Sequence, residues 1–122
     1  MVVMVVEDSP TMRQLICYGL RRVEGMVVVE AADGVDGLAK LAEIKPDVIV
    51  TDLNMPNMDG FAFIENIRAR PDLKTIPIII LTTQGALPDQ KRAQELAVTT
   101  FVTKPIRGDA VLDAVMQVVG KK

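Results

Sequence analysis

Polar side chains stand where several short apolar runs of this sequence end. The runs are rich in valine and isoleucine, and they lead into three acids, one hydroxyl and one amine: Glu7, Asp8, Asp52, Thr82 and Lys104. An acid directly after a buried run is costly unless a partner or a chemical role compensates for it. At a separation of about 4 Å, two carboxylates repel by roughly 4 kcal/mol at an effective dielectric constant of about 20. Lys104 offsets one charge of three, and a divalent cation would balance the other two.

This set of side chains suits phosphoryl transfer. The candidate ligands are hard oxygens and the sequence contains no histidine, so the expected metal is Mg²⁺, with Mn²⁺ as the alternative. A cation and a lysine neutralise phosphoryl oxygens while a carboxylate, here Asp52, accepts the group. The lack of histidine also excludes Ser/His/Asp and Cys/His catalysis and the common zinc sites.

The elements that must carry these residues alternate between strand and helix. Strand patterns cover residues 2–6, 27–29, 48–50, 76–81 and 100–102. Amphipathic spacing between start and stop signals predicts helices over about 10–23, 34–45, 60–70, 88–97 and 109–119. Ser9, Asp33 and Asp59 are the expected N-caps of the first three helices. Leu15 and Val35 are counted in the apolar stripes of the first two.

Strands that alternate with amphipathic helices predict an α/β fold, with helices on both faces of a parallel five-stranded sheet. The first, third and fourth strands are the most apolar, which favours central places for them and the order 2-1-3-4-5. The five polar side chains then meet at the carboxyl edge of the sheet, where open α/β sheets bind ligands. Residues 1–122 are expected to form one domain.

Composition limits the class of protein. The chain is 49% hydrophobic and 25% charged with a formal net charge of −2, so neither disorder nor a nucleic-acid partner is expected. A secretory signal is not expected, and no apolar run approaches the ~20 residues that span a bilayer, so membrane insertion is not expected either. Cys17 is the single cysteine, which favours a reducing, cytoplasmic location and a buried filler role for this side chain.

Several stretches resemble the receiver domain of two-component response regulators, most closely the single-domain chemotaxis regulators. They are Glu7 to Arg13, Ala32 to Gly37, Asn54 to Gly60, Leu81-Thr82 and Phe101 to Pro105. The spacings of 30 residues from Asp52 to Thr82 and 22 from Thr82 to Lys104 are also those of the family. The resemblance runs through essentially the whole chain. It implies the flavodoxin-like (βα)5 doubly wound fold and a phosphorylation-activated signalling function.

The resemblance implies a role for each acid. Asp52 would accept a phosphoryl group from a histidine kinase or a small phosphodonor. Glu7 and Asp8 would hold Mg²⁺ together with Asp52 and the backbone carbonyl of Asn54. Glu7 stands where aspartate is commoner in the family, and its extra methylene is expected to move it toward a water-mediated metal contact.

The resemblance also implies a switch. Thr82 and Lys104 would bind the phosphoryl group, and Lys104-Pro105 looks like the family's cis peptide. Phe101 takes the place of the family's aromatic switch residue and lacks a hydroxyl, so it must act by burial of its ring. The face made by the fourth helix, fifth strand and fifth helix would then bind a downstream protein, with the flagellar motor switch as one candidate. A monomer is expected.

Other functions stay open. The chain could be a phosphorelay shuttle or a receiver fragment of a larger regulator. A metal-dependent phosphatase with an aspartyl intermediate is a second alternative, although no further acid is placed to protonate a leaving group. A phosphorylation-independent interaction module is a third, although such modules usually lose the acids or the lysine kept here. As a receiver, the chain would catalyse only its own phosphorylation and dephosphorylation.

Overall fold

The computed structural model describes residues 1–83, 90–104, 106 and 109–120. Within these residues the strands are β1 (Val2–Val6), β2 (Val27–Ala31), β3 (Val48–Asp52), β4 (Ile78–Thr83) and β5 (Thr100–Lys104). The helices are α1 (Pro10–Arg21), α2 (Gly34–Leu41), α3 (Gly60–Arg68), α4 (Gln90–Glu95) and α5 (Ala110–Gly120). In this described part of the chain, no helix has the length and apolar character needed to cross a bilayer.

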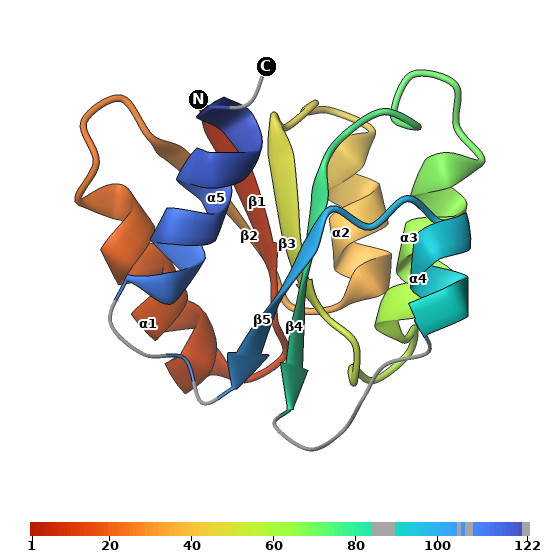
Figure 1. Ribbon diagram of the computed structural model, residues 1–122, viewed down its shortest axis with the longest axis horizontal. Helices are drawn as coiled ribbons and strands as arrows, with labels where there is room; N and C mark the ends of the chain where they lie inside the picture. Colours follow the sequence, from red (N-terminus) through yellow and green to blue (C-terminus); the bar gives the residue numbers. More distant parts are fainter. Residues whose placement is uncertain (84–89, 105, 107–108, 121–122) are drawn as a thin grey trace.

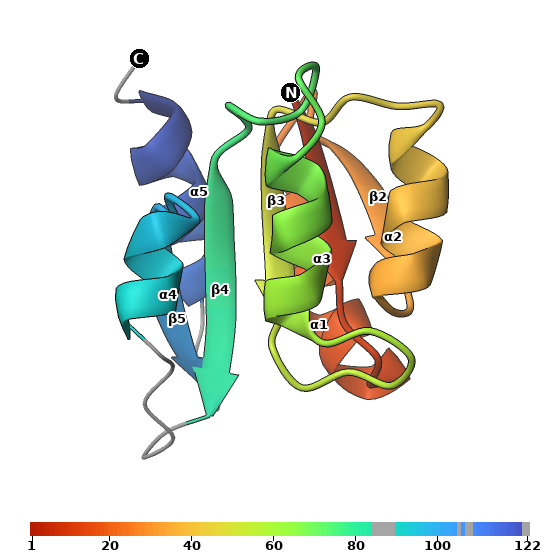
Figure 2. The same cartoon turned by 90° about the vertical axis from the view of Figure 1, so that its right-hand side faces the viewer.

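The strands form one parallel sheet in the order β2-β1-β3-β4-β5, which confirms the predicted order. Figure 1 shows α1 and α5 on one face of this sheet and α2, α3 and α4 on the other. Figure 2 shows the same layers from the side of α3, with β5 at one edge of the sheet and β2 at the other. The carboxyl ends of β1, β3, β4 and β5 therefore lie along the same edge.

The sheet separates two apolar cores, and β1 contributes to both. Val3 and Val5 pack with α1 and α5, whereas Met4 and Val6 pack with α2 and α3. Successive strand side chains point to opposite faces, so a strand covered on both sides must be apolar throughout. The valine-rich run that predicted β1 is thus explained by burial on two faces.

Two large side chains that were predicted in helix stripes are exposed instead. Leu15 is 54% exposed and Val35 is 51% exposed. A helix turns by about 100° per residue, and the buried side of α1 is defined by Ile16, Cys17 and Leu20. Leu15 therefore lies well away from the buried side of α1. Val35 likewise lies away from the buried side of α2. The burial of Cys17 agrees with its predicted role as a filler.

Two strands differ from their predicted limits. β4 begins at Ile78 rather than Ile76, and β5 continues to Lys104 rather than ending at Val102. Pairing between the two strands carries both of them past their apolar runs. Thr82 and Lys104 are therefore strand residues and do not follow their strands.

The ends of the first four helices were also placed too late in the sequence. α1 ends at Arg21 and α2 at Leu41, because tighter turns replace the helical hydrogen-bond pattern after them. Gly25 then adopts a φ of 82°, a left-handed conformation that glycine adopts without strain. α4 ends at Glu95, and the predicted start of this helix at residue 88 lies outside the described residues.

Candidate functional site

Asp52 is the last residue of β3, at the centre of the carboxyl edge of the sheet, and only 5% of it is exposed. Its Oδ1 accepts hydrogen bonds from the backbone N–H groups of Leu53, at 2.7 Å, and Asn54, at 3.4 Å. Its Oδ2 lies 3.0 Å from the Nζ of Lys104. Both oxygens therefore accept hydrogen bonds from positively polarised partners.

Lys104 bridges two acids that lie far from it in the sequence. Its Nζ lies 2.7 Å from Oε1 of Glu7 and 3.0 Å from Oδ2 of Asp52. Burial alone would lower the pKa of Lys104, but the hydrogen bonds to Glu7 and Asp52 outweigh it and raise the pKa. The amine is therefore a permanent cation between the two carboxylates at neutral pH.

Glu7 is fully buried directly after β1 and is held at four of its atoms. Its N–H donates to the carbonyl of Ala31 at 3.1 Å, and its carbonyl oxygen accepts from Nη1 of Arg13 at 2.7 Å. Its Oε2 accepts from the backbone N–H of Ser9 at 3.0 Å, and its Oε1 faces Lys104. Burial raises the pKa of Glu7, and the bonds from Lys104 and Ser9 only partly offset this.

Three acids converge at this edge. One carboxylate oxygen each from Glu7, Asp8 and Asp52 lies within 4.8 Å of the other two, and Asp8 is the exposed member. At that distance two unit charges repel by about 3.5 kcal/mol at an effective dielectric constant of about 20. Lys104 compensates one charge of the three. A set of hard carboxylate oxygens that is open to solvent at Asp8 fits Mg²⁺, which binds few protein ligands and keeps several waters.

The loop after β3 depends on glycine for its path. Gly60 donates its N–H to the carbonyl of Leu53 at 2.8 Å, which brings the start of α3 back against the end of β3. A Cβ at position 60 would overlap the carbonyl oxygen of Asp52 and lie 2.7 Å from the Cα of Leu53. Within the loop, Asn57 has a φ of 68°, a left-handed conformation that asparagine tolerates. The loop therefore closes tightly beside Asp52.

The remaining predicted residues lie around this cluster. Thr82 is buried in β4 directly after Leu81, which is the register partner of Asp52. Phe101 of β5 is 38% exposed and lines a hollow of about 350 Å³ with the side of α4. The backbone carbonyl of Asn54 was a predicted metal ligand, and in the structure the N–H of Asn54 donates to Oδ1 of Asp52. Pro105 lies outside the described residues, so the expected cis peptide has no structural description.

Two contacts of Glu7 were missed by reasoning from the sequence. The sequence pattern gives Arg13 no part in the site, yet it donates to the carbonyl of Glu7. Ser9 was identified as the N-cap of α1, but its own N–H also binds the Glu7 carboxylate. The signal for Arg13 was weak, because an arginine one turn into a helix is usually exposed.

The chain matches the response regulator receiver domain over residues 3–116. It is 36% identical over 121 residues to chemotaxis protein CheY1 of Helicobacter pylori, and the match covers 98% of both chains. It is 40% identical over 107 residues to protein-glutamate methylesterase/protein-glutamine glutaminase 6 of Anaeromyxobacter dehalogenans, of which it spans only 30%.

Among solved structures, it superimposes on the receiver domain of sensor histidine kinase PA1611 of Pseudomonas aeruginosa, which has a magnesium ion coordinated in its active-site cleft. The TM-score is 0.85 at 25% identity, over 98% of this chain and 97% of the other. The family match spans nearly the whole chain, and the chain therefore belongs to the response regulator receiver domain family.

Proposed function

We propose that this receiver domain takes a phosphoryl group on Asp52 and thereby changes the surface formed by α4, β5 and α5. Receiver domains are signalling modules that take phosphoryl groups from histidine kinases and bind downstream targets. The observation that carries the assignment to Asp52 is its position in a trio of acids within 4.8 Å, with the Lys104 amine 3.0 Å from its Oδ2.

In the proposed reaction, an oxygen of Asp52 attacks the phosphorus of a kinase phosphohistidine. The bond from phosphorus to the imidazole nitrogen breaks, the nitrogen keeps the electron pair, and an acyl phosphate forms on Asp52. Lys104 carries its proton throughout and pairs with a phosphoryl oxygen as the charge of Asp52 is shared with the new group. Its raised pKa supports this role.

The metal position follows from the same residues. Glu7, Asp8, Asp52 and the backbone carbonyl of Asn54 would hold Mg²⁺, and bound Mg²⁺ would supply positive charge to the phosphoryl oxygens. Mn²⁺ prefers similar hard oxygen ligands and would substitute for it. The buried Glu7 carboxylate already accepts from Lys104 and Ser9, which supports a water-mediated rather than a direct metal contact for this residue.

The proposed switch uses Thr82 and Phe101. The Thr82 hydroxyl would hydrogen-bond the phosphoryl group, and movement of Thr82 would vacate space for the Phe101 ring. The ring is now 38% exposed and borders a hollow lined by Lys91, Ala93, Gln94 and Val98. Burial of the ring would change this hollow, and with it the surface offered by α4 and β5.

We further propose a chemotaxis-type role for the domain. The support is the match to chemotaxis protein CheY1, which covers 98% of both chains. The partner would be a flagellar motor switch protein that binds the monomeric, phosphorylated form. Loss of the phosphoryl group by in-line attack of water would reset the domain, without turnover of external substrates. One sheet with two helix layers supports a single domain over 1–122.

Labelling with acetyl phosphate and Mg²⁺, followed by intact-mass measurement, tests the assignment. The wild-type chain should gain one phosphoryl group and Asp52→Asn should gain none. Asp59→Asn is the matched control, because Asp59 is an acid of the same region whose cap on α3 an asparagine can keep. Normal labelling of Asp52→Asn would overturn the assignment.

Binding tests the proposed partner. The affinity of a flagellar motor switch protein for the chain should rise when Mg²⁺ and beryllofluoride, a mimic of the phosphoryl group, are added. Equal affinity with and without beryllofluoride would contradict the proposed partner and leave the assignment of Asp52 intact.

A further inference from the structure

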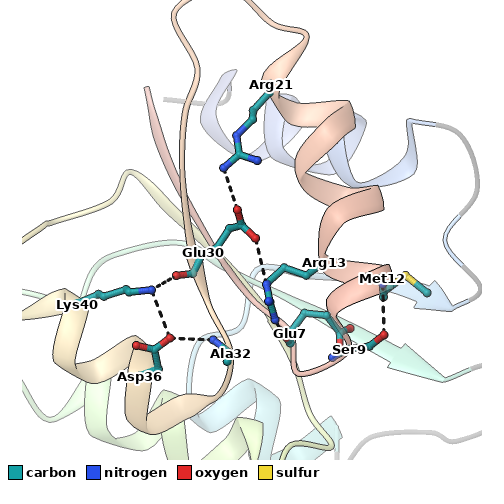
Figure 3. A network of polar contacts seen from close by, with 9 residues as sticks. All are labelled: Glu7, Ser9, Met12, Arg13, Arg21, Glu30, Ala32, Asp36 and Lys40. Atoms are coloured by element: carbon teal, nitrogen blue, oxygen red, sulfur yellow. Dashed lines mark hydrogen bonds and ion pairs between the residues drawn. The ribbon is translucent and has the colours of Figure 1, made fainter.

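Arg13 connects the acidic site to the outer strand of the sheet. Its Nη1 donates to the carbonyl oxygen of Glu7 at 2.7 Å, and its Nε lies 3.1 Å from Oε1 of Glu30. Glu30 belongs to β2, an edge strand. Figure 3 shows the Arg13 side chain lying between Glu30 and the start of α1, with Arg21 on the other side of Glu30. One guanidinium thus spans from the surface of β2 to the backbone of the site.

The oxygen atom that Arg13 binds lies between the two acids in the chain. The carbonyl of Glu7 belongs to the peptide group that joins Glu7 to Asp8, the two acids that follow β1. The two torsions that flank this planar group, ψ of Glu7 and φ of Asp8, together set the direction of one side chain relative to the other, and rotation about either one alone changes it. A charge-assisted hydrogen bond at 2.7 Å restricts that rotation. Arg13 therefore holds the peptide group between the two acids in one orientation.

Glu30 in turn holds Arg13. Its Oε1 pairs with Arg13 while its Oε2 pairs with Nη2 of Arg21 at 3.0 Å. The backbone at Glu30 is itself anchored, because its carbonyl accepts from Nζ of Lys40, which also pairs with Asp36 at 3.3 Å. Figure 3 shows these contacts in one chain from α2 to α1. An arginine fixed at its Nε by a carboxylate presents Nη1 in a defined direction, because the guanidinium is planar and rigid.

We propose that Arg13, oriented by Glu30, is a positioning residue that sets the geometry of Glu7 and Asp8 for metal binding. The inference rests on the proposed metal site. It adds to that site a pair of supporting residues, Glu30 on β2 and Arg13 on α1. Partners behind metal ligands typically change metal affinity by about 10- to 100-fold when they are removed.

The sign of the effect separates positioning from simple electrostatics. Arg13 is a cation next to the acids, so by charge alone its removal would strengthen binding of Mg²⁺. If Arg13 positions Glu7 and Asp8, its removal weakens binding, because the two carboxylates lose their common orientation. The two explanations therefore predict opposite directions for the same variant.

The experiment measures Mg²⁺ affinity by calorimetry and by the amide NMR shifts of Asp8 and Asp52, in the absence of any phosphodonor. Arg13→Ala should bind Mg²⁺ about tenfold more weakly. Arg13→Lys should stay weaker than the wild type, because one ammonium cannot hold Glu30 and the carbonyl of Glu7 in the same fork. Arg21→Ala is the matched control, since it removes the other arginine from Glu30 and should leave the affinity unchanged.

The role of Glu30 is tested by a double-mutant cycle. Glu30→Ala should weaken Mg²⁺ binding in the wild-type background and have no further effect in the Arg13→Ala background. Glu30 is partly exposed on an edge strand, so Glu30→Ala can be measured alone if Arg13→Ala fails to fold, and unchanged Mg²⁺ binding by it would then contradict the inference. Thermal unfolding of each variant shows whether an affinity change occurs in a folded protein.

Unchanged or tighter Mg²⁺ binding by Arg13→Ala would overturn the inference, as would wild-type affinity in Arg13→Lys or additive effects in the double variant. In all three cases the wild-type chain still binds Mg²⁺ and the proposed function stands. Failure of the wild-type chain itself to bind Mg²⁺ would instead overturn the proposed metal site, and this inference with it.

Discussion

Gly60 packs so closely against the end of β3 that a Cβ at its position would overlap the carbonyl oxygen of Asp52. This contact brings the first turn of α3 against the backbone of Asp52, the proposed phosphoacceptor. The geometry of the site therefore depends on the residue type at position 60, because the loop can close beside Asp52 only if residue 60 has no side chain.

Gly60→Ala is accordingly expected to destabilise the fold by about 1–3 kcal/mol, the usual cost of forcing an extra group into a packed region. It should also slow labelling by acetyl phosphate, because the backbone of Asp52 must shift. Urea unfolding and labelling rates provide the two measurements.

Gly19→Ala is the control: a Cβ there meets nothing within 4 Å, and alanine in a helix is favourable by up to about 1 kcal/mol. Equal effects of the two variants would contradict the role of Gly60.

Lys104→Ala should separate metal binding from phosphorylation. Without the amine, Glu7 and Asp52 lose the cation that lies 2.7 and 3.0 Å from them. Mg²⁺ should then bind at least about tenfold more tightly, because a unit charge a few ångströms away is worth several kcal/mol at an effective dielectric constant of about 20. Phosphorylation should nevertheless slow, since a phosphoryl oxygen loses its partner. Mg²⁺ titration and the rate of labelling by acetyl phosphate measure the two effects. Lys45→Ala is the control, because Lys45 is exposed. Weaker Mg²⁺ binding by Lys104→Ala would contradict the prediction.

Glu30 should make folding stability depend on pH in the acidic range. Hydrogen bonding to Arg21, followed by that to Arg13, holds the pKa of Glu30 below its usual value although burial opposes this. The contribution of the ionised carboxylate is therefore fully present above the ordinary glutamate pKa of about 4.3. It is lost as the pH falls below that value toward the lowered native pKa. Urea unfolding from pH 7 down to pH 3 should show a smaller loss of stability for Glu30→Gln than for the wild type, and identical pH profiles would contradict it.

Cys17 should be unreactive in the native state. It is fully buried in α1, and burial raises the pKa of its thiol to about 11. Both effects remove the reactive thiolate, so a thiol reagent at neutral pH should label the chain only in proportion to unfolding. Labelling with and without denaturant, read by mass, measures this. Rapid labelling without denaturant would show that α1 opens readily or that the thiol is accessible.

Arg68 should be important for the attachment of α4. Its guanidinium donates to the carbonyl oxygens of Lys74, Ile76, Leu96 and Ala97 at 2.7 to 3.1 Å. Burial lowers the pKa of Arg68, and these four hydrogen bonds all run to backbone carbonyls. Arg68→Ala would leave these carbonyls without their donor and should cost at least about 3 kcal/mol of stability.

The matched control for Arg68 is Arg70→Ala. Arg70 lies on the same segment and makes an exposed ion pair with Asp72 at 3.5 Å, which is worth little. Thermal unfolding compares the two variants, and hydrogen exchange of residues 93–98 reports on the end of α4. Equal stability of the two variants would contradict the role given to Arg68.

The sequence by itself determined the fold and the candidate residues of the site. A short apolar strand that is covered on both faces, such as β1, pairs its backbone N–H and C=O groups with neighbouring strands in a sheet. Because the strands alternate with helices, that sheet is parallel. The N-caps Ser9, Asp33 and Asp59 were predicted and are confirmed by their hydrogen bonds to the first helical turns. Because the carboxyl ends of parallel strands share one edge, strand order alone was enough to bring the acids and Lys104 together.

Only the tertiary structure decided how these residues pair. Lys104 and Glu7 are 97 residues apart, and nothing local in the sequence indicates that the amine lies between Glu7 and Asp52. The link from Glu30 through Arg13 to the carbonyl of Glu7 depends on how α1 packs against β2, and the exposure of Leu15 depends on which side of α1 meets the sheet. Periodicity describes one element at a time, whereas hydrogen bonds of about 3 Å depend on the relative placement of several elements, which only packing determines.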